Sequence, residues 1–319
     1  MSNLIPHQQP SSFFHAQERD ILAELLADKR SENTRRAYDK DLKDFFLSVS
    51  GHEPNPQLII EFLKLERFTA IALVLQYKAK LIEKGLAEAT VNRRLAAIKS
   101  LVKYAQKIGK CEWSLEEVQG EKAKAYRDTS GVDRDSYRAI LEGCDRSTLQ
   151  GQRNYAILRL LWDNALRRGE VVKLNVSDFD AEARSLTILG KGRGTQKERV
   201  SLSAATVEAI EAWLQHFPNW GKDSPLFIAL DNVHHGHRLT GNAIYNLVFE
   251  AAQKAGIKKR FSPHRCRHSS ITAALDATGG NVREVQKLSR HKNLQTVLLY
   301  DDARLNAQQK VTDLLSEMM

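Results

Sequence analysis

The chain has 319 residues, of which 42% are hydrophobic, 27% are charged and only 7 are proline. This balance excludes disordered, collagen-like and low-complexity chains, and the length exceeds what one hydrophobic core usually supports, so we expect two domains. Lysine and arginine number 48 against 39 acidic residues, which gives a net charge of +9 and favours a polyanionic partner such as nucleic acid.

Several features of the sequence argue against secretion and membrane insertion. No stretch offers the roughly 20 uncharged apolar residues that a membrane helix needs. The first 16 residues lack the basic start and apolar core of a secretion signal. The three cysteines form no Cys-x-x-Cys pair, which predicts free thiols in a reducing compartment. We therefore expect a cytoplasmic, nucleoid-associated protein.

The first part of the chain is expected to be a helical domain. Residues 1–16 are polar and without pattern, which predicts a flexible tail, and the helical pattern then extends over 17–112. A charged, weakly periodic stretch over 113–131 predicts a linker. The helices expected in this domain cover 17–28, a segment starting after Ser31, 56–83 and 90–108.

The last expected helix of this domain is strongly basic. Between Thr90 and Lys110 there are six lysines and arginines and no acidic residue. Helical spacing separates an apolar stripe from an adjacent cationic stripe. Because no acidic residue lies one turn away, we expect phosphate contact rather than a merely solvated face. The apolar stripe is Val91, Leu95, Ile98, Val102 and Ala105, and the cationic one is Asn92, Lys99, Lys103, Lys107 and Lys110.

The remainder is expected to be a second domain over 132–304, mainly helical with a small antiparallel sheet. Helical patterns cover 134–143 and 150–166 and return after Ala204. Between them, SLTIL (185–189) and ERVSL (198–202) flank a turn rich in Gly, Lys and Arg, which predicts a β-hairpin. Within 305–319, the apolar spacing of Val311, Leu314, Leu315 and Met318 predicts an amphipathic helix.

Four clusters in this second domain carry groups suited to phosphoryl transfer. Two guanidinium groups can neutralise the charge that builds up on phosphorus. A tyrosine nucleophile conserves the energy of the broken strand as an ester, and a lysine at a hairpin tip can protonate the leaving 5′-oxygen. The clusters are LRRGE (166–170), GKG (190–192), HRCRH (264–268), and His291 followed nine residues later by Tyr300.

This order of residues resembles the tyrosine recombinase (phage integrase) family, which includes Xer-type and Cre-like enzymes. The resemblance covers about residues 17–305. In the first domain, NTRRAY (33–38) and TVNRRL (90–95) resemble two recurrent patterns of the family's core-binding domain. The catalytic residues that the resemblance implies are Arg167, Lys191, His264, Arg267, His291 and Tyr300, supported by Glu170. The candidate DNA-binding residues are Arg35, Arg36, Asn92, Arg93, Arg94, Lys99, Lys103 and Lys107.

The resemblance also implies an architecture and a reaction. It implies a two-domain DNA clamp, with a helical SAM-like core-binding domain and an α+β catalytic domain. Tyr300 is expected to form a 3′-phosphotyrosyl link, and four copies are expected to exchange strands between two duplex sites through a Holliday junction. The C-terminal helix of each copy is expected to dock on a neighbour. No metal and no other cofactor is implied.

The sequence departs from the family pattern at three places. Asn164-Ala165 stands where the family usually has Thr-Gly, and Arg290 stands where it usually has Gly. The longer hairpin turn makes Lys197 a competitor for the acid role of Lys191. Two alternatives remain, a type IB topoisomerase-like swivelase and a DNA-binding regulator without catalysis.

Some histidines and one cysteine are not expected to bind a metal or to take part in catalysis beyond the roles given above. Zinc binding by His264 and His268 is disfavoured because arginines lie between them and no carboxylate follows. The histidines at 234, 235 and 237 are expected in a solvated turn. Cys266 is expected to be a small packed residue.

Overall fold

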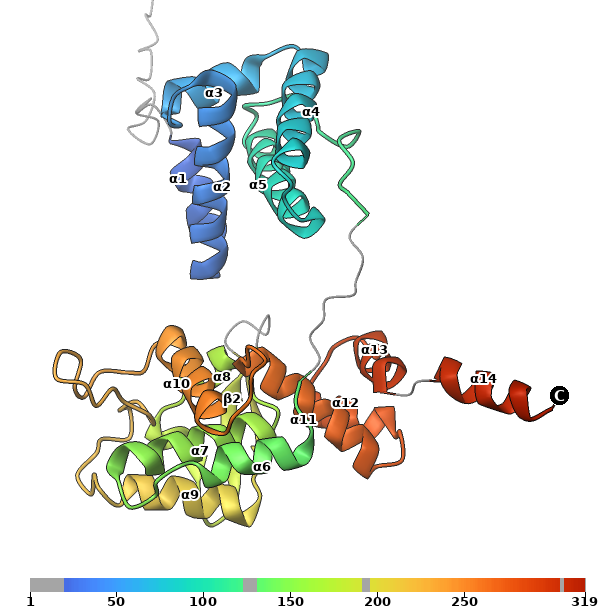
Figure 1. The fold of residues 1–319 in the computed structure, drawn as a ribbon. Helices are drawn as coiled ribbons and strands as arrows, with labels where there is room; N and C mark the ends of the chain where they lie inside the picture. Colours follow the sequence, from blue (N-terminus) through green and yellow to red (C-terminus); the bar gives the residue numbers. More distant parts are fainter. Residues whose placement is uncertain (1–19, 123–130, 191–195, 305–306, 319) are drawn as a thin grey trace, which may run out of the picture. The chain divides into compact units, whose positions relative to one another are not determined.

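A computed structural model of the chain describes residues 20–122, 131–190, 196–304 and 307–318 (Figure 1). The chain divides into two compact units between Arg127 and Asp128. The expected tail over 1–16 and Lys191 lie outside the described residues. Within the described ranges, none of the helices combines the length and the apolar character that crossing a membrane requires.

The described residues of the N-terminal unit form helices joined by short turns (Figure 1). Ser31 and Asn55 cap the second and third helices with their side chains, because each accepts a hydrogen bond from an N–H in the first turn. The helices are α1 (Ile21–Asp28), α2 (Glu32–Ser50), α3 (Pro56–Lys64), α4 (Arg67–Glu83) and α5 (Glu88–Lys107).

The prediction of one helix over 56–83 was wrong, because the chain turns between α3 and α4. Leu65 N–H donates to the carbonyl of Phe62 at 3.3 Å, which closes the end of α3. The carboxylate of Glu66 then accepts the N–H of Thr69 at 3.0 Å and caps α4. A side chain that satisfies a free N–H at a helix start is a strong start signal, although glutamate is an uncommon choice.

The core of this unit is aromatic at one end and aliphatic along α5. The Phe62 ring packs edge-to-face against Phe45, Phe46 and Trp113, with centroid distances of 5.3, 5.7 and 5.5 Å. Trp113 follows α5 in the chain, so the segment after the last helix closes over the aromatic group. The predicted apolar stripe of α5 is confirmed, since all five of its residues are buried.

The C-terminal unit is mainly helical and contains a small antiparallel sheet, which confirms the predicted fold class. Helix α7 lies beside α9 and also packs against α11 (Figure 1). The helices are α6 (Arg134–Glu142), α7 (Leu149–Asp163), α8 (Arg168–Val172), η2 (Val176–Asp178), α9 (Ala204–Leu214), α10 (Gly241–Lys254), α11 (Pro263–Ala277), α12 (Val282–Ser289), α13 (Gln295–Arg304) and α14 (Ala307–Glu317).

The predicted hairpin is confirmed with a shift of one residue. Strand β2 (Ser185–Leu189) pairs with β3 (Lys197–Ser201), so β3 begins and ends one residue before the predicted segment. Leu186 lies opposite Val200, and a short strand β1 (Phe179–Asp180), which the sequence did not indicate, pairs with the other edge of β2. The hairpin therefore brings the ends of its turn, Leu189 and Lys197, opposite each other.

The helix predicted over 150–166 ends earlier, at Asp163. Ala165 has a φ of 45°, a left-handed backbone conformation that cannot continue a right-handed helix. The chain turns through Asn164–Leu166 and enters α8 at Arg168, which makes Arg167 the residue that caps α8. This turn sets the position of the first expected catalytic arginine.

The aromatic group of the N-terminal unit gives the first prediction. Phe62→Ala removes the ring that touches three others, so the free energy of unfolding should fall by about 3 to 5 kcal/mol, measured by urea denaturation. Phe68→Ala is the matched control, because the Phe68 ring is 70% exposed and its loss should change stability by less than about 0.5 kcal/mol. Equal losses for the two variants would contradict this core.

Candidate active site

The expected catalytic residues within the described ranges come from four elements of the C-terminal unit. Arg167 caps α8, Arg267 lies on α11, His291 follows α12 and Tyr300 lies on α13. His264 is exposed in the first turn of α11, and its charge acts on His291. Segments more than a hundred residues apart in the sequence therefore supply one site.

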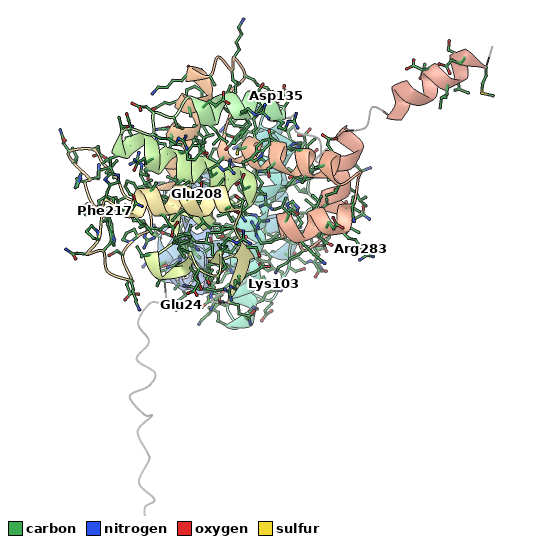
Figure 2. The ribbon with its side chains drawn as sticks, turned by 90° about the horizontal axis from the view of Figure 1, so that it is seen from below. Glu24, Lys103, Asp135, Glu208, Phe217 and Arg283 are labelled. Atoms are coloured by element: carbon green, nitrogen blue, oxygen red, sulfur yellow. The ribbon has the colours of Figure 1, made fainter. Side chains whose placement is uncertain are left out.

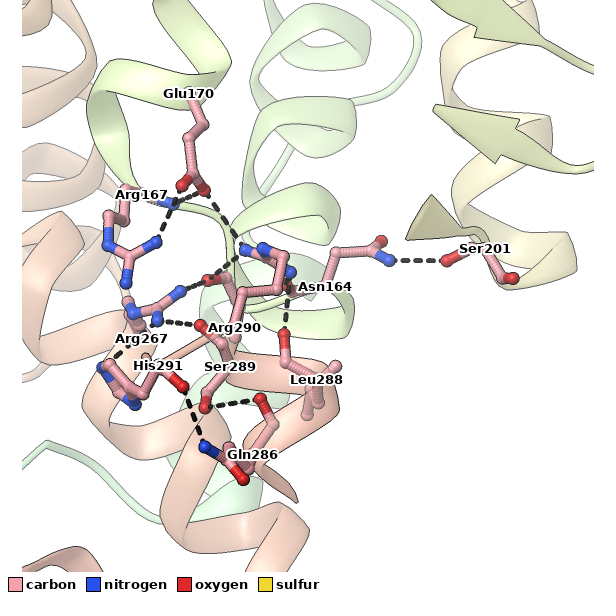
Figure 3. Close-up of polar contacts among 11 residues, drawn as sticks. Asn164, Arg167, Glu170, Ser201, Arg267, Gln286, Leu288, Ser289, Arg290 and His291 are labelled. Atoms are coloured by element: carbon pink, nitrogen blue, oxygen red, sulfur yellow. Dashed lines mark hydrogen bonds and ion pairs between the residues drawn. The ribbon is translucent and has the colours of Figure 1, made fainter. Parts of the chain in front are cut away.

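Glu170 accepts hydrogen bonds from both Arg167 and Arg290 in this site (Figure 3). Its side chain is 2% exposed. Arg167 donates to it twice, from the backbone N–H to Oε2 and from Nη1 to Oε1, both at 2.8 Å. Arg290 Nη2 donates to Oε2 at 3.1 Å. Burial raises the pKa of Glu170, but the charges of Arg290 and Arg167 and their hydrogen bonds outweigh it, so the net pKa is lowered.

Arg267 is almost fully buried and is held by backbone carbonyls. Nη1 donates to the carbonyl of Ala165, and Nη2 donates to that of Ser289 and contacts His291 Nε2 at 3.3 Å. Burial, reinforced by the like charges of Arg167 and Arg290, lowers the pKa of Arg267 to about 9. The guanidinium is therefore still charged at pH 7, in a fixed position.

His291 is neutral at pH 7 in this setting. Burial lowers its pKa to about 4, and the neighbouring charges of Arg267, Arg167 and Arg290 act in the same direction. Because a guanidinium only donates, Nε2 of His291 must be the acceptor of the Arg267 contact, which assigns the proton to Nδ1. Nδ1 is buried and has no hydrogen-bond partner among the described residues.

Tyr300 packs on a small apolar cluster between α11, α12 and α13. Its ring centroid lies 4.4 Å from that of His268 and 5.9 Å from that of His291. Burial raises the pKa of Tyr300, and the charges of Arg267 and Arg167 oppose this rise only in part. The phenol is therefore protonated at neutral pH and must lose its proton to act as a nucleophile.

Two residues of this site, Arg290 and His268, had no predicted role in it. Arg290 was recognised only as a departure from glycine, and its guanidinium contacts Glu170. His268 was considered only as a zinc ligand, and its ring touches that of Tyr300. Among the described residues, no group of three or more His, Cys, Asp or Glu side chains is placed to hold a metal ion.

The contacts of three other residues in this unit bear on expectations from the sequence. Lys197 Nζ forms an ion pair with Asp178, which is 6% exposed. His234 Nδ1 lies 3.0 Å from Asp231 Oδ1 in an exposed turn, as predicted. Cys266 is fully buried and its Sγ lies 3.2 Å from Tyr137 Oη, which confirms a packed residue.

Comparison with known proteins identifies the family. Residues 131–306 match the phage integrase family, and residues 22–109 match the phage integrase N-terminal SAM-like domain. A tyrosine recombinase of Synechocystis sp. is 54% identical to this chain, over 94% of this chain and 96% of the relative. The chain belongs to the tyrosine recombinase (phage integrase) family. Its function is therefore site-specific recombination of DNA.

More distant comparisons agree with this assignment. Tyrosine recombinase XerD of Listeria innocua is 29% identical to this recombinase, over 88% of this chain and 92% of the relative. A structure of XerH bound to palindromic difH substrate has a TM-score of 0.67 at 20% identity, and covers 92% of this chain and 84% of that one. This structural likeness shows the fold. The topoisomerase and regulator alternatives are not favoured by these comparisons.

The basic residues of the recombinase's α5 are not all available to DNA, so the expectation that they lack acidic partners is wrong. Arg93 and Arg94 form ion pairs with Asp41 and Asp44 of α2. These partners come from the neighbouring helix α2 and not from positions one turn away on α5, where acidic residues are absent. The side chain of Arg94 is only 15% exposed, so its contacts are structural.

Asn92 also has structural contacts. Its Nδ2 donates to the carbonyl of Glu121 at 2.9 Å, and the N–H of Glu121 donates to its Oδ1 at 2.7 Å. These paired bonds fasten the segment after α5 to that helix. The more accessible DNA-binding candidates on α5 are Arg93, whose side chain is 42% exposed, Lys103, which is labelled in Figure 2, and Lys107, while Lys99 is half-buried. On α2 they are Arg35 and Arg36, of which Arg36 forms an ion pair with Glu32.

The depressed pKa of His291 predicts a pH dependence of stability. As pH falls below 6.5, the ordinary value, the unfolded chain binds a proton that the folded one does not take up until about pH 4. His291 therefore does not reduce the free energy of unfolding above pH 6.5, and it reduces this free energy progressively as the pH falls towards 4. His291→Phe should lose less stability than the parent between these pH values in urea denaturation. Parallel curves would contradict a neutral, buried His291.

Proposed function

We propose that Tyr300 attacks the scissile phosphodiester of duplex DNA, forming a 3′-phosphotyrosyl ester while the 5′-oxygen leaves as a free hydroxyl. The proposal is carried by the position of the phenol, whose ring lies beside that of His291 and which is affected by the charges of Arg167 and Arg267. Attack by a strand's free 5′-hydroxyl on the ester reverses the step and rejoins the DNA without an external energy source.

The two arginines are proposed to neutralise the charge on the phosphate oxygens during attack. Arg167 retains a partly exposed side chain, 29%, while Glu170 fixes one of its nitrogens. Arg267 is immobilised by two carbonyls and by His291. Donors fixed before the substrate arrives need little reorganisation in the transition state, which is the basis of electrostatic catalysis.

Proton transfer completes the proposed scheme. The Tyr300 phenol keeps its proton until attack. Neutral His291 has Nε2 as its one acceptor atom, so it can take up this proton only when Nε2 exchanges its contact with Arg267. His264 is proposed to assist by hydrogen bonding to the phosphate. Lys191 is proposed as the acid that protonates the 5′-oxygen, and the engagement of Lys197 by Asp178 supports this choice.

The wider proposal follows the family scheme. Residues 17–112 form the core-binding domain, 113–131 the linker and 132–304 the catalytic domain. The first part of the linker, as far as Glu121, packs on the core-binding domain through Trp113 and Asn92. Four copies hold two DNA sites in the cytoplasm and exchange strands through a Holliday junction. The helix α14 docks on a neighbouring copy, which is supported by the exposure of Leu314, Leu315 and Met318 at 51%, 59% and 79%. In a solved structure a lambda integrase dimer is bound to a core site, and duplex DNA is proposed as the partner here.

A covalent-adduct assay tests this function. The protein should form an SDS-resistant adduct, in EDTA, with nicked duplexes that cover the DNA around its own gene. Tyr300→Phe should abolish the adduct, because no other phenol is proposed to attack, while binding in a gel shift persists. An adduct that survives in Tyr300→Phe, or cleavage that depends on a divalent cation, would contradict the proposed chemistry.

The exposed lysines of α5 give a second test, directed at DNA binding. Lys103→Ala should weaken binding and reduce the slope of log affinity against log salt by about one, since one phosphate contact is lost. Its stability should be unchanged. In contrast, Arg94→Met should lower the free energy of unfolding by about 1 to 3 kcal/mol, because Asp44 and the Tyr77 hydroxyl lose the guanidinium that binds both. The reverse pattern would reassign both residues.

The C-terminal helix gives a third test. Deletion of residues 306–319 should leave binding to a single half-site intact but weaken the assembly of several copies on a full site, as measured by light scattering. The reason is that the exposed apolar side chains of α14 would no longer be available to a neighbour. An undiminished assembly would contradict the docking role.

A further inference from the structure

We propose that Arg290 is a positioning residue of the cleavage site, which fastens the turn that carries His291 to the turn that carries Arg167. This inference rests on the proposed function and deepens it. Arg290 lies between Ser289, whose carbonyl accepts from Arg267, and His291. Its side chain is 5% exposed, so it acts through its neighbours rather than on the DNA.

The two turns share an unusual backbone feature. Ala165 and Arg290 both have positive φ values, 45° and 56°. This left-handed conformation is unfavourable for residues with a side chain, and it persists only where surrounding contacts impose it. The same two positions are those where the family usually has glycine. Contacts that impose the conformation are therefore expected at both positions.

The Arg290 guanidinium supplies these contacts (Figure 3). From Nη1 it donates to the carbonyl of Asn164 at 3.0 Å and to that of Leu288 at 2.7 Å. From Nη2 it donates to the carbonyl of Ala165 at 3.3 Å and to Glu170 Oε2 at 3.1 Å. One side chain thus spans both strained turns and the central carboxylate.

Two acceptor atoms connect Arg290 to both catalytic arginines. The carbonyl of Ala165 accepts from Arg290 and from Arg267. Glu170 Oε2 accepts from Arg290 and from the backbone N–H of Arg167. A displacement of Arg290 therefore affects the positions of both guanidinium groups and of the adjoining His291.

Charge supports the same conclusion. Three arginines carry charges that interact with Glu170: Arg167 at the start of α8, Arg290 at the end of α12 and Arg267 on α11. The negative charge of Glu198 on β3 also interacts with Arg290. The Arg290 charge is the largest single contribution that lowers the pKa of Glu170. Without Arg290, Glu170 should take up a proton at a higher pH, and its ion pair with Arg167 should then be lost.

The test measures single-turnover adduct formation on a nicked duplex that carries the cleavage site mapped for the parent protein. At saturating protein, Arg290→Met should slow the first-order rate about tenfold to a hundredfold, the usual cost of misplaced reacting groups, with DNA affinity changed less than about twofold. The acid limb of its pH–rate profile should move to higher pH, because Glu170 loses a cation. Arg290→Lys, which keeps the charge, should restore the acid limb in part.

Arg184→Met is the matched control. Arg184 is an exposed residue with a φ of 43°, so this variant makes the same exchange in the same backbone conformation outside the site. The rate of this variant should equal that of the parent. In Glu170→Gln/Arg290→Met, the two substitutions should slow the reaction no more than the slower single variant, because they break one connected network.

Three outcomes would overturn the role of Arg290. The first is that Arg290→Met has the rate and the pH profile of the parent. The second is that Arg290→Met is slower without a pH shift, and that the fold-reductions in rate of the two single variants multiply in the double variant. The third is loss of folding in both Arg290→Met and Arg290→Gly, judged by circular dichroism, which would show a folding role alone. Absence of an adduct in the parent, or its survival in Tyr300→Phe, would instead overturn the proposed function, and this inference with it.

Discussion

The arrangement of the site depends on the hydrogen bonds and ion pairs of the buried Glu170 carboxylate. An ionised carboxylate that is 2% exposed requires compensating donors, and here both oxygens have them. These donors come from the start of α8 and the end of α12, so satisfying one charge brings two distant turns together. The positions of Arg167 and Arg290 follow from this requirement, and that of His291 follows from its neighbour Arg290.

Burial of the other site residues sets the protonation states on which the proposed chemistry depends. It keeps His291 neutral and the Tyr300 phenol protonated, while the guanidinium of Arg267 remains charged at pH 7. The site therefore holds fixed positive charge beside a nucleophile that is not yet ionised. An incoming phosphodiester supplies the negative charge that the arginines compensate, and in the proposed scheme the phenol loses its proton during the attack itself.

The sequence predicted those features that depend on local periodicity or on residue order. The stripe from Val91 to Ala105 and the hairpin around 185–201 follow from helical and alternating spacing, and both are confirmed. The break at Glu66 is local but was missed, because glutamate is an uncommon cap for an N–H three residues away. The Asp41 and Asp44 partners of α5 and the contact of Arg290 with Glu170 depend on residues that meet only in three dimensions. No pattern within a few residues encodes them. The departures from glycine at 165 and 290 were the one available signal, because a side chain in a left-handed position needs external support.

The most direct test of the account is whether the guanidinium groups act by neutralising the phosphate. The measurement is the rate of adduct formation by Arg167→Ala on a duplex whose scissile linkage is a phosphodiester or an uncharged methylphosphonate. The quantity compared is the rate of Arg167→Ala divided by the rate of the parent protein on the same linkage. Because the neutral linkage presents no charge to compensate, this ratio should be at least about tenfold higher on the methylphosphonate than on the phosphodiester. An equally slow reaction on both linkages would contradict the account.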